Sequence, residues 1–188
     1  WNVPRAYRDI EDVITDPQVQ VVHVCTPNHL HQVHVKTALA AGVHVLCERP
    51  LALSVGGVED IIAARERADR VVFVGMQSRF RSDVQAVKQF LDGGELGTLY
   101  AVRTGWYTFK PARGVLGWRR RRAQSGGGAM LDLGLSLIDL SLWMLDWPTP
   151  CHVSASFGPA ERDAEFVEDS GVALITCKGG ASIAVDVS

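Results

Sequence analysis

The side chains of the first half that could do chemistry gather in two short polar turns, each directly after an apolar stretch. One turn follows residues 18–25 and the other follows residues 43–47. Together the turns contain Thr26, Pro27, Asn28, Glu48, Arg49 and Pro50. Charged side chains are rarely buried without a partner, so a Glu-Arg pair that ends a buried strand indicates a binding role more than simple packing.

A helix is predicted between these turns, with Thr26 or Asn28 as its N-cap. Apolar or small residues recur at helical spacing along the face expected to be buried: Leu30, Val33, Thr37, Ala38 and Ala41. Gly42 ends the helix, because only glycine takes the left-handed turn at low cost. Strand, helix and strand with short links predict a parallel crossover unit. Ligands of open parallel sheets bind beyond the carboxyl ends of the strands, so we expect both turns to face one ligand.

The other cluster of reactive side chains follows a triple glycine, in a helix predicted over residues 129–145. Asp132, Ser136 and Asp139 are spaced i, i+4 and i+7, which places them on one face of that helix. The opposite stripe is apolar and is expected to be buried: Leu131, Leu135, Ile138, Leu142 and Leu145. The polar face fits a substrate site, and it also fits a solvated or hydrogen-bonded surface.

Residues 1–97 alternate strands with helices, which is typical of an α/β domain with a parallel sheet. A third buried strand is predicted at 71–76, and Arg79 follows its end closely enough to be a ligand candidate in the same crevice. The pattern then breaks at Gly93, Gly94 and Gly97, which predicts a domain boundary.

Residues 98–188 do not alternate strands with helices. They contain the helix at 129–145, and strands are predicted at 99–108, 152–157, 171–177 and 181–187. We therefore expect a partial parallel α/β sheet, followed by an α+β domain with a mostly antiparallel sheet.

Composition argues against several classes of protein. The 188 residues are 47% hydrophobic and 21% charged, as in a globular protein with one large or two small domains. A net charge of −2 and a pI near 6.3 give no general attraction to nucleic acid or to anionic membranes. No apolar run approaches the ~20 residues needed to span a bilayer. The basic run at 119–122 is expected to bind an anionic substrate or cofactor phosphate, or to face solvent, rather than to bind nucleic acid.

The cysteines and histidines do not predict a metal site. Four cysteines lie far apart without a CxxC spacing, which is typical of small buried thiols in a reducing cytoplasm: Cys25, Cys47, Cys151 and Cys177. His29, His31 and His34 are close in sequence, but no acidic or sulfur residue nearby completes a set of ligands.

Three segments in order resemble the Gfo/Idh/MocA family, whose members include glucose–fructose oxidoreductase and inositol dehydrogenase. They are TPNHLH at 26–31, HVLCERP at 44–50 and GGGAMLDLG at 126–134, and the resemblance runs from about Tyr7 to the end. It implies a Rossmann-type sheet, NAD or NADP as cofactor, and a sugar, polyol or related alcohol as substrate. It also implies a homo-oligomer formed through the sheet of the second domain.

The resemblance implies that the first two segments contact the cofactor through Thr26, Pro27, Asn28, His31, Glu48 and Pro50. His31 is equally well explained as a packed, hydrogen-bonded group. The family has a lysine where this chain has Arg49 and a histidine where it has Ser136. Arginine stays charged, so it is a poor general base, and a serine hydroxyl does not titrate near neutral pH. Asp132 alone remains of the three reacting groups.

Further substrate contacts are expected from Asp139, Tyr107, Lys110 and Trp118. Tyr107 and Lys110 are the nearest alternative proton carriers in sequence, and Trp118 could stack on a sugar ring or pack in a core or interface. The glycine-rich phosphate turn GxGxxG is absent from these residues, so we expect an internal fragment or a natural truncation. Two functions stay open: an altered NAD(P)-dependent oxidoreductase, or a non-catalytic homologue that binds a dinucleotide or metabolite.

Overall fold

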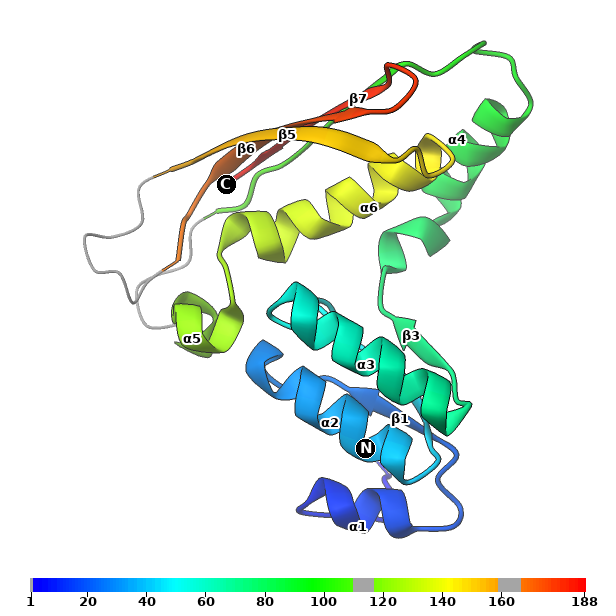
Figure 1. Ribbon diagram of the computed structural model, residues 1–188, viewed down its shortest axis with the longest axis vertical. Helices are drawn as coiled ribbons and strands as arrows, with labels where there is room; N and C mark the ends of the chain where they lie inside the picture. The colour runs from blue at the N-terminus through cyan, green and yellow to red at the C-terminus, as the bar shows by residue number, and fades with distance from the viewer. Residues whose placement is uncertain (1, 110–116, 159–166) are drawn as a thin grey trace. The chain divides into compact units, whose positions relative to one another are not determined.

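The computed structural model describes residues 2–109, 117–158 and 167–188 (Figure 1). The chain divides into two compact units, Trp1–Gly75 and Met76–Ser188. The boundary lies earlier than the one predicted at Gly97. The reason is that Arg79 and Lys88, which precede Gly97, make their ion pairs with Asp139 and Asp146 of the second unit.

The first unit is a parallel sheet with helices. Its elements are α1 (Ile10–Thr15), β1 (Val21–Val24), α2 (Asn28–Ala40), β2 (His44–Cys47), α3 (Val55–Ala68) and β3 (Val72–Val74). The strands pair in the order β1-β2-β3, all parallel. Val24 pairs with Cys47 and Cys47 pairs with Val74, so the three strands end at one level. The predicted crossover unit is confirmed, and both polar turns lie at this carboxyl edge.

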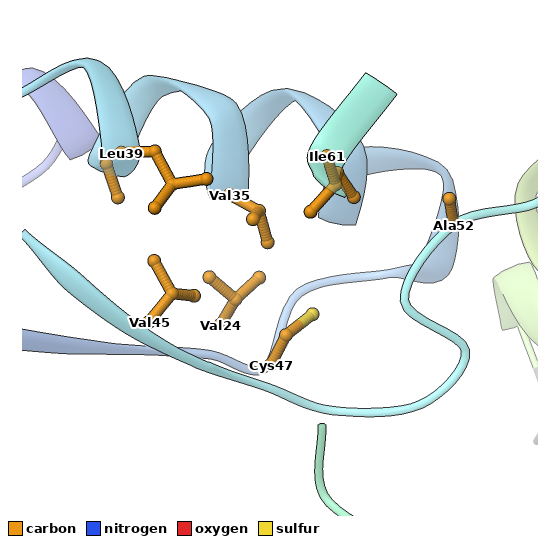
Figure 2. Packing of buried hydrophobic residues seen from close by; sticks show 8 residues of the cluster. Val24, Val35, Leu39, Val45, Cys47, Ala52 and Ile61 are labelled. Atoms are coloured by element: carbon orange, nitrogen blue, oxygen red, sulfur yellow. The ribbon is translucent and has the colours of Figure 1, made fainter. Parts of the chain in front are cut away.

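Helix α2 packs on the sheet through a different face from the one predicted. It buries His31, Val35, Ala38 and Leu39, whereas Val33 is exposed. Apolar residues occur around much of this helix, so periodicity alone does not choose the buried stripe. Figure 2 shows the resulting core between α2, α3 and the sheet, formed by Val24, Val35, Ala38, Leu39, Val45, Cys47, Ala52 and Ile61.

The second unit begins with η1 (Gln77–Phe80) and α4 (Ser82–Asp92). Its sheet consists of β4 (Ala101–Trp106), β5 (Pro150–Phe157), β6 (Gly171–Cys177) and β7 (Ser182–Val187). The strand order is β4-β7-β6-β5, with β4 and β7 parallel and the other pairs antiparallel. The fold class is therefore confirmed, including the mostly antiparallel second sheet.

The long helix predicted at 129–145 is interrupted by a change of helix type. A π-helical turn, η3 (Met130–Gly134), leads into α6 (Leu135–Met144), after the short helices η2 (Gly117–Arg120) and α5 (Arg122–Ser125). Helix α6 lies along one face of the sheet (Figure 1). Its predicted apolar stripe is confirmed in its second half, where Ile138, Leu142 and Leu145 pack on the sheet beside the buried Leu137.

Backbone conformation and close packing favour glycine in the triple-glycine segment. The segment also contacts Glu168, a residue that the sequence pattern did not indicate. Gly126 ends α5 with a φ of +85°, a left-handed conformation that favours glycine. A Cβ at Gly128 would overlap the Glu168 carbonyl oxygen. The Glu168 carboxylate accepts hydrogen bonds from the backbone N–H groups of Gly128 at 2.9 Å and Met130 at 3.3 Å. Glu168 thus satisfies donors at the start of this helix.

The helical stretch Arg122–Met144 is long and apolar enough, by length and composition alone, to cross a membrane. No apolar run of this length is predicted from the sequence. Helices that are apolar on most sides occur in protein cores as well as in membranes. Here Leu137, Ile138 and Leu142 pack on the sheet, and this packing accounts for the apolar composition.

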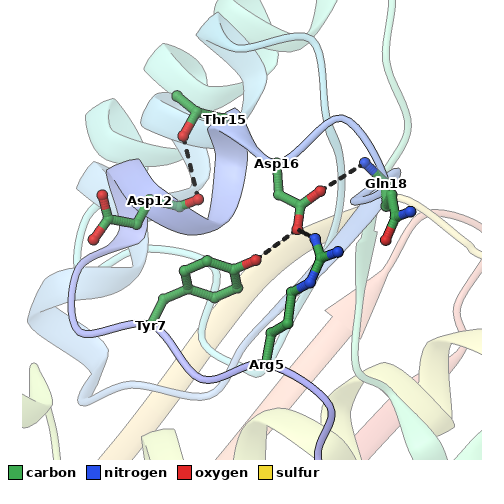
Figure 3. Close-up of polar contacts among 6 residues, drawn as sticks. All are labelled: Arg5, Tyr7, Asp12, Thr15, Asp16 and Gln18. Carbon is green, nitrogen blue, oxygen red and sulfur yellow. Dashed lines mark hydrogen bonds and ion pairs between the residues drawn. The ribbon is translucent and has the colours of Figure 1, made fainter.

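The segment before α1 is fastened by a single carboxylate (Figure 3). Asp16 Oδ2 accepts hydrogen bonds from Tyr7 at 2.5 Å and from Arg5 Nη1 at 2.6 Å, and Oδ1 accepts from the Gln18 N–H at 2.9 Å. The Tyr7 hydrogen bond, followed by those from Gln18 and Arg5, lowers the pKa of Asp16 to about 2.

This carboxylate predicts a specific pH dependence. Because the folded-state pKa of Asp16 lies below its usual 3.8, its contribution to stability is present above about pH 4 and is lost as the pH falls through about 2. Asp16→Asn should lower the free energy of unfolding at neutral pH. It should also make this free energy fall less steeply between about pH 4 and about pH 2 than in the wild type, as measured by urea denaturation. Asp12→Asn, an exposed position on α1, is the control. An Asp16→Asn variant with the wild-type pH slope would contradict this account.

Candidate functional site

His31 joins the two polar turns of the first unit. Its side chain is only 1% exposed, and its Nδ1 and Nε2 atoms each lie 2.7 Å from a carbonyl oxygen, of Pro50 and of Thr26 respectively. A carbonyl oxygen only accepts hydrogen bonds, so whichever ring nitrogen carries a proton donates to the carbonyl oxygen that faces it. The structure therefore shows His31 as the packed, hydrogen-bonded group, and its effect is to hold the turn after β1 against the turn after β2.

The first turn is capped differently from the prediction. Pro27, rather than Thr26 or Asn28, occupies the N-cap of α2, and Asn28 is the first helical residue. The Thr26 hydroxyl instead lies 3.1 Å from Nδ1 of His34, on the next turn of the helix. The Thr26 side chain is thus held to α2, and its carbonyl is held by His31.

The second turn presents a half-exposed acid, Glu48, which contacts His23 and lies beside Gly75. Glu48 Oε1 lies 3.0 Å from His23 Nε2, and a Cβ on Gly75 would come within 3.1 Å of Glu48 Oε2. The absence of a side chain at Gly75 therefore leaves room for this carboxylate. Arg49 is partly buried and is joined to Pro50 by a cis peptide bond.

In the second unit, two predicted ligand residues bind each other. Arg79 Nε donates to Asp139 Oδ2 at 2.7 Å and Arg79 Nη2 donates to Asp139 Oδ1, so both carboxylate oxygens are used. The guanidinium also lies 4.7 Å from the centre of the Trp147 ring. Asp139 is buried. This pairing gives Asp139 and Arg79 a role in fixing η1 on α6, whether or not either also meets a ligand.

Lys88 is a buried charge that the sequence analysis did not single out. It contacts Asp92 at 2.5 Å and Asp146 at 2.7 Å, and its ammonium lies 5.8 Å from the centre of the Trp143 ring. These hydrogen bonds, with Asp146 first, raise the pKa of Lys88. On α4 Lys88 is buried, while its apolar neighbour Val87 is exposed.

The π turn separates residues that the sequence placed on one face. Asp132 lies within η3 and is exposed, whereas Ser136 and Asp139 lie on α6 and are buried. The Ser136 hydroxyl has no hydrogen-bond partner among the described residues. The spacing i, i+4 holds for a regular α-helix, and a π turn changes the angle between successive residues. Asp132 is therefore the accessible acid of this helix.

Tyr107 and Trp118, the other predicted substrate residues that the structure describes, each have a contact of their own. Tyr107 hydrogen-bonds with Asp186, which raises the tyrosine pKa. Asp186 alternates along β7 with the buried Val185 and Val187, so this pair lies on the sheet face opposite α6. Trp118 lies in η2 with the Arg119 guanidinium 4.6 Å from its ring centre. The predicted contact of Lys110 lies outside the described residues.

The parallel sheet with polar turns at its carboxyl edge defines an α/β domain of the nucleotide-binding type. Residues 1–76 match the model of an oxidoreductase family described as having an NAD-binding Rossmann fold, and residues 84–188 match the GFO/IDH/MocA C-terminal domain. The chain belongs to the Gfo/Idh/MocA family of oxidoreductases.

Characterised relatives share the sequence at moderate identity. The 1,5-anhydro-D-fructose reductase of Ensifer adhaerens is 28% identical over 95% of this chain and 53% of its own length. The D-glucoside 3-dehydrogenase of Escherichia coli is 27% identical over 100% of this chain and 55% of its own. Myo-inositol 2-dehydrogenase of Thermotoga maritima is 29% identical over 77% and 41%. The chain thus spans about half the length of these relatives.

Solved structures show the same fold. GenD2 of gentamicin A biosynthesis, in complex with NAD, has a TM-score of 0.90 and 32% identity, over 98% of this chain and 52% of its own. Levoglucosan dehydrogenase, in complex with NADH and levoglucosan, has a TM-score of 0.86 and 26% identity, over 97% and 51%.

The His31 contacts can be tested by stability. His31→Ala leaves two buried carbonyl oxygens without donors and opens a cavity, so the free energy of unfolding should fall by roughly 2–4 kcal/mol. His29→Ala, an exposed position on the same helix, should change it by less than about 0.5 kcal/mol. Urea denaturation of both variants measures the difference. Equal stability of the two variants would contradict the bridging role of His31.

Proposed function

We propose that this protein transfers a hydride between NAD or NADP and an alcohol or carbonyl group of a sugar, polyol or related substrate. The observation that carries the proposal is the buried His31, which holds two polar turns together at the carboxyl edge of a parallel sheet. Open α/β sheets bind nucleotides at this edge. The names of relatives that act on a D-glucoside and on myo-inositol support a sugar-like substrate.

The first unit offers groups that suit the nicotinamide side of a dinucleotide. The Glu48 carboxylate is half exposed at the strand end and can accept hydrogen bonds from ribose hydroxyls. Gly75 leaves open the space beside it that a Cβ would fill. Bound there, the nicotinamide would supply or accept the hydride.

Side chains of this protein would stabilise the developing negative charge and take up the proton. Oxidation of an alcohol releases a hydride from carbon and a proton from the hydroxyl oxygen. Arg49 keeps its positive charge and would stabilise negative charge developing on that oxygen. We assign the proton to the Asp132 carboxylate, the exposed acid of η3. Ser136, which replaces the family's histidine, cannot store a proton near neutral pH.

A second function is favoured by the same replacements. Arg49 and Ser136 stand where the family has a lysine and a histidine, and the Ser136 hydroxyl is buried with no hydrogen-bond partner in the described parts of the chain. Asp139 is held by Arg79. A protein that keeps the scaffold and lacks the acid–base pair would bind a dinucleotide or metabolite without turning it over.

The test uses the protein with any residues that its gene encodes beyond these 188. Calorimetry measures binding of NAD(H) and NADP(H), and the absorbance of the reduced cofactor follows turnover across a panel of sugars and polyols. We expect both binding and turnover. Asp132→Asn should lower kcat about 10²- to 10⁴-fold, the usual contribution of an acid–base group, and leave cofactor affinity unchanged. Asp12→Asn, exposed on α1, should leave both unchanged.

The alternatives give distinct results. Cofactor binding without turnover, with activity gained only in the double variant Arg49→Lys, Ser136→His, would establish the non-catalytic binder. Failure of the whole gene product to bind either cofactor would overturn both functions.

We also propose that the protein forms a homo-oligomer through the sheet face opposite α6. On β6 that face carries Val172, 51% exposed, and Leu174, 49% exposed. Their neighbours across the sheet are Ser156 and Ser154 on β5 and Asp186 and Ala184 on β7. The exposed apolar side chains of Val172 and Leu174 would be covered if one such sheet packed against another.

Leu174→Lys should disrupt this oligomer, because it would bury a charge between two sheets. Light scattering coupled to gel filtration should show a smaller species than for the wild type at the same concentration. Val33→Lys, at a residue 52% exposed on α2, is the matched control. A monomeric wild type, or an oligomer that survives Leu174→Lys, would refute the interface.

We place the protein in a reducing compartment such as the cytoplasm. All four cysteines are free. Cys47 and Cys177 are buried as predicted, whereas Cys25 and Cys151 are exposed, contrary to the prediction. Burial is the main cause that raises the pKa of Cys47 to about 12, so this thiol is unreactive at neutral pH.

A further inference from the structure

A set of metal-ligating side chains lies at the carboxyl edge of the first-unit sheet, on the face away from its core. His23 and Cys25 flank the buried Val24 in the chain, so alternation directs both to the opposite face. Glu48 follows the buried Cys47 on the neighbouring strand and reaches the same face. The ligand atoms of His23, Cys25 and Glu48 all lie within 4.8 Å of one another.

We propose that His23, Cys25 and Glu48 bind a divalent cation of the zinc class. Imidazole nitrogen, thiolate sulfur and carboxylate oxygen are the three donor types that zinc takes in proteins. Magnesium and calcium prefer sets made only of oxygen, so the sulfur and nitrogen argue against them. The proposed hydride transfer uses no metal, so this site goes beyond that function and its test needs no dinucleotide.

The geometry needs little adjustment to close around an ion. Zinc bonds of about 2.0–2.3 Å at tetrahedral angles set ligand atoms about 3.3–3.6 Å apart. His23 Nε2 and Glu48 Oε1 are 3.0 Å apart, and Cys25 is exposed and free to rotate about its χ1. The backbone beneath is fixed, because the Glu48 N–H donates to the Val24 carbonyl at 3.0 Å. Three protein ligands leave a fourth position for water.

The charges also balance. A divalent cation neutralises one carboxylate and one thiolate, and its binding displaces the Cys25 proton into solvent. A simple ion pair between His23 and Glu48 makes no use of Cys25. This cysteine therefore discriminates between a metal site and an ion pair.

The test titrates the 188-residue chain with zinc chloride by calorimetry, and with cobalt(II) chloride by absorption spectroscopy. We expect one equivalent of zinc to bind, and cobalt to give a thiolate charge-transfer band. Cys25→Ser should abolish the band and weaken zinc binding by at least ~10–100-fold, the effect of losing an outer-shell partner alone. His23→Gln and Glu48→Gln should each weaken binding to a similar extent. The ligand side chains are exposed or half exposed, so these variants should keep the wild-type circular dichroism spectrum.

Matched controls separate this site from adventitious binding. Cys151→Ser removes an exposed cysteine on β5, and His29→Gln removes an exposed histidine on α2. Both should bind zinc as the wild type does. The proposal is overturned by the absence of zinc binding, by unchanged affinity in Cys25→Ser, or by equal losses in Cys25→Ser and Cys151→Ser. None of these outcomes bears on dinucleotide binding, so failure here is distinct from failure of the proposed function.

Discussion

The buried imidazole of His31 is the constraint on which the functional edge of the first unit depends. Parallel strands place their carboxyl ends at one edge, but the turns that follow them are free to diverge. His31 limits that freedom, because its two ring nitrogens lie 2.7 Å from the carbonyl oxygens of Pro50 and Thr26. Glu48 and Asn28 are thereby presented from one rigid edge rather than from two independent loops.

In the second unit, charged side chains are buried between α6 and the elements packed beside it. Asp139 and Lys88 are both buried, and each is paired, with Arg79 and with Asp92 and Asp146 respectively. An unpaired buried charge would cost several kcal/mol, so these pairs join η1 and α4 to α6 in one arrangement. Asp132 is exposed and lies outside this layer, on the π turn that precedes α6.

The chain combines the family's fold with different side chains at two of the positions where the family has reacting groups. Arg49 and Ser136 replace the two side chains that titrate most readily, and neither can take up a proton at neutral pH. The arginine retains the positive charge of lysine, so electrostatic stabilisation of an oxygen survives where proton transfer does not.

The sequence by itself determined the elements and their order, because hydrophobic period and glycine position are local properties. The crossover unit, the strands of the second sheet and the stop at Gly42 are all confirmed. Tertiary contact alone decided the rest. Which face of α2 is buried depends on the sheet beneath it, and the pairing of Arg79 with Asp139 joins residues sixty positions apart. Local periodicity carries no information about such partners, and the cluster of His23, Cys25 and Glu48 exists only because the strands pair in this register.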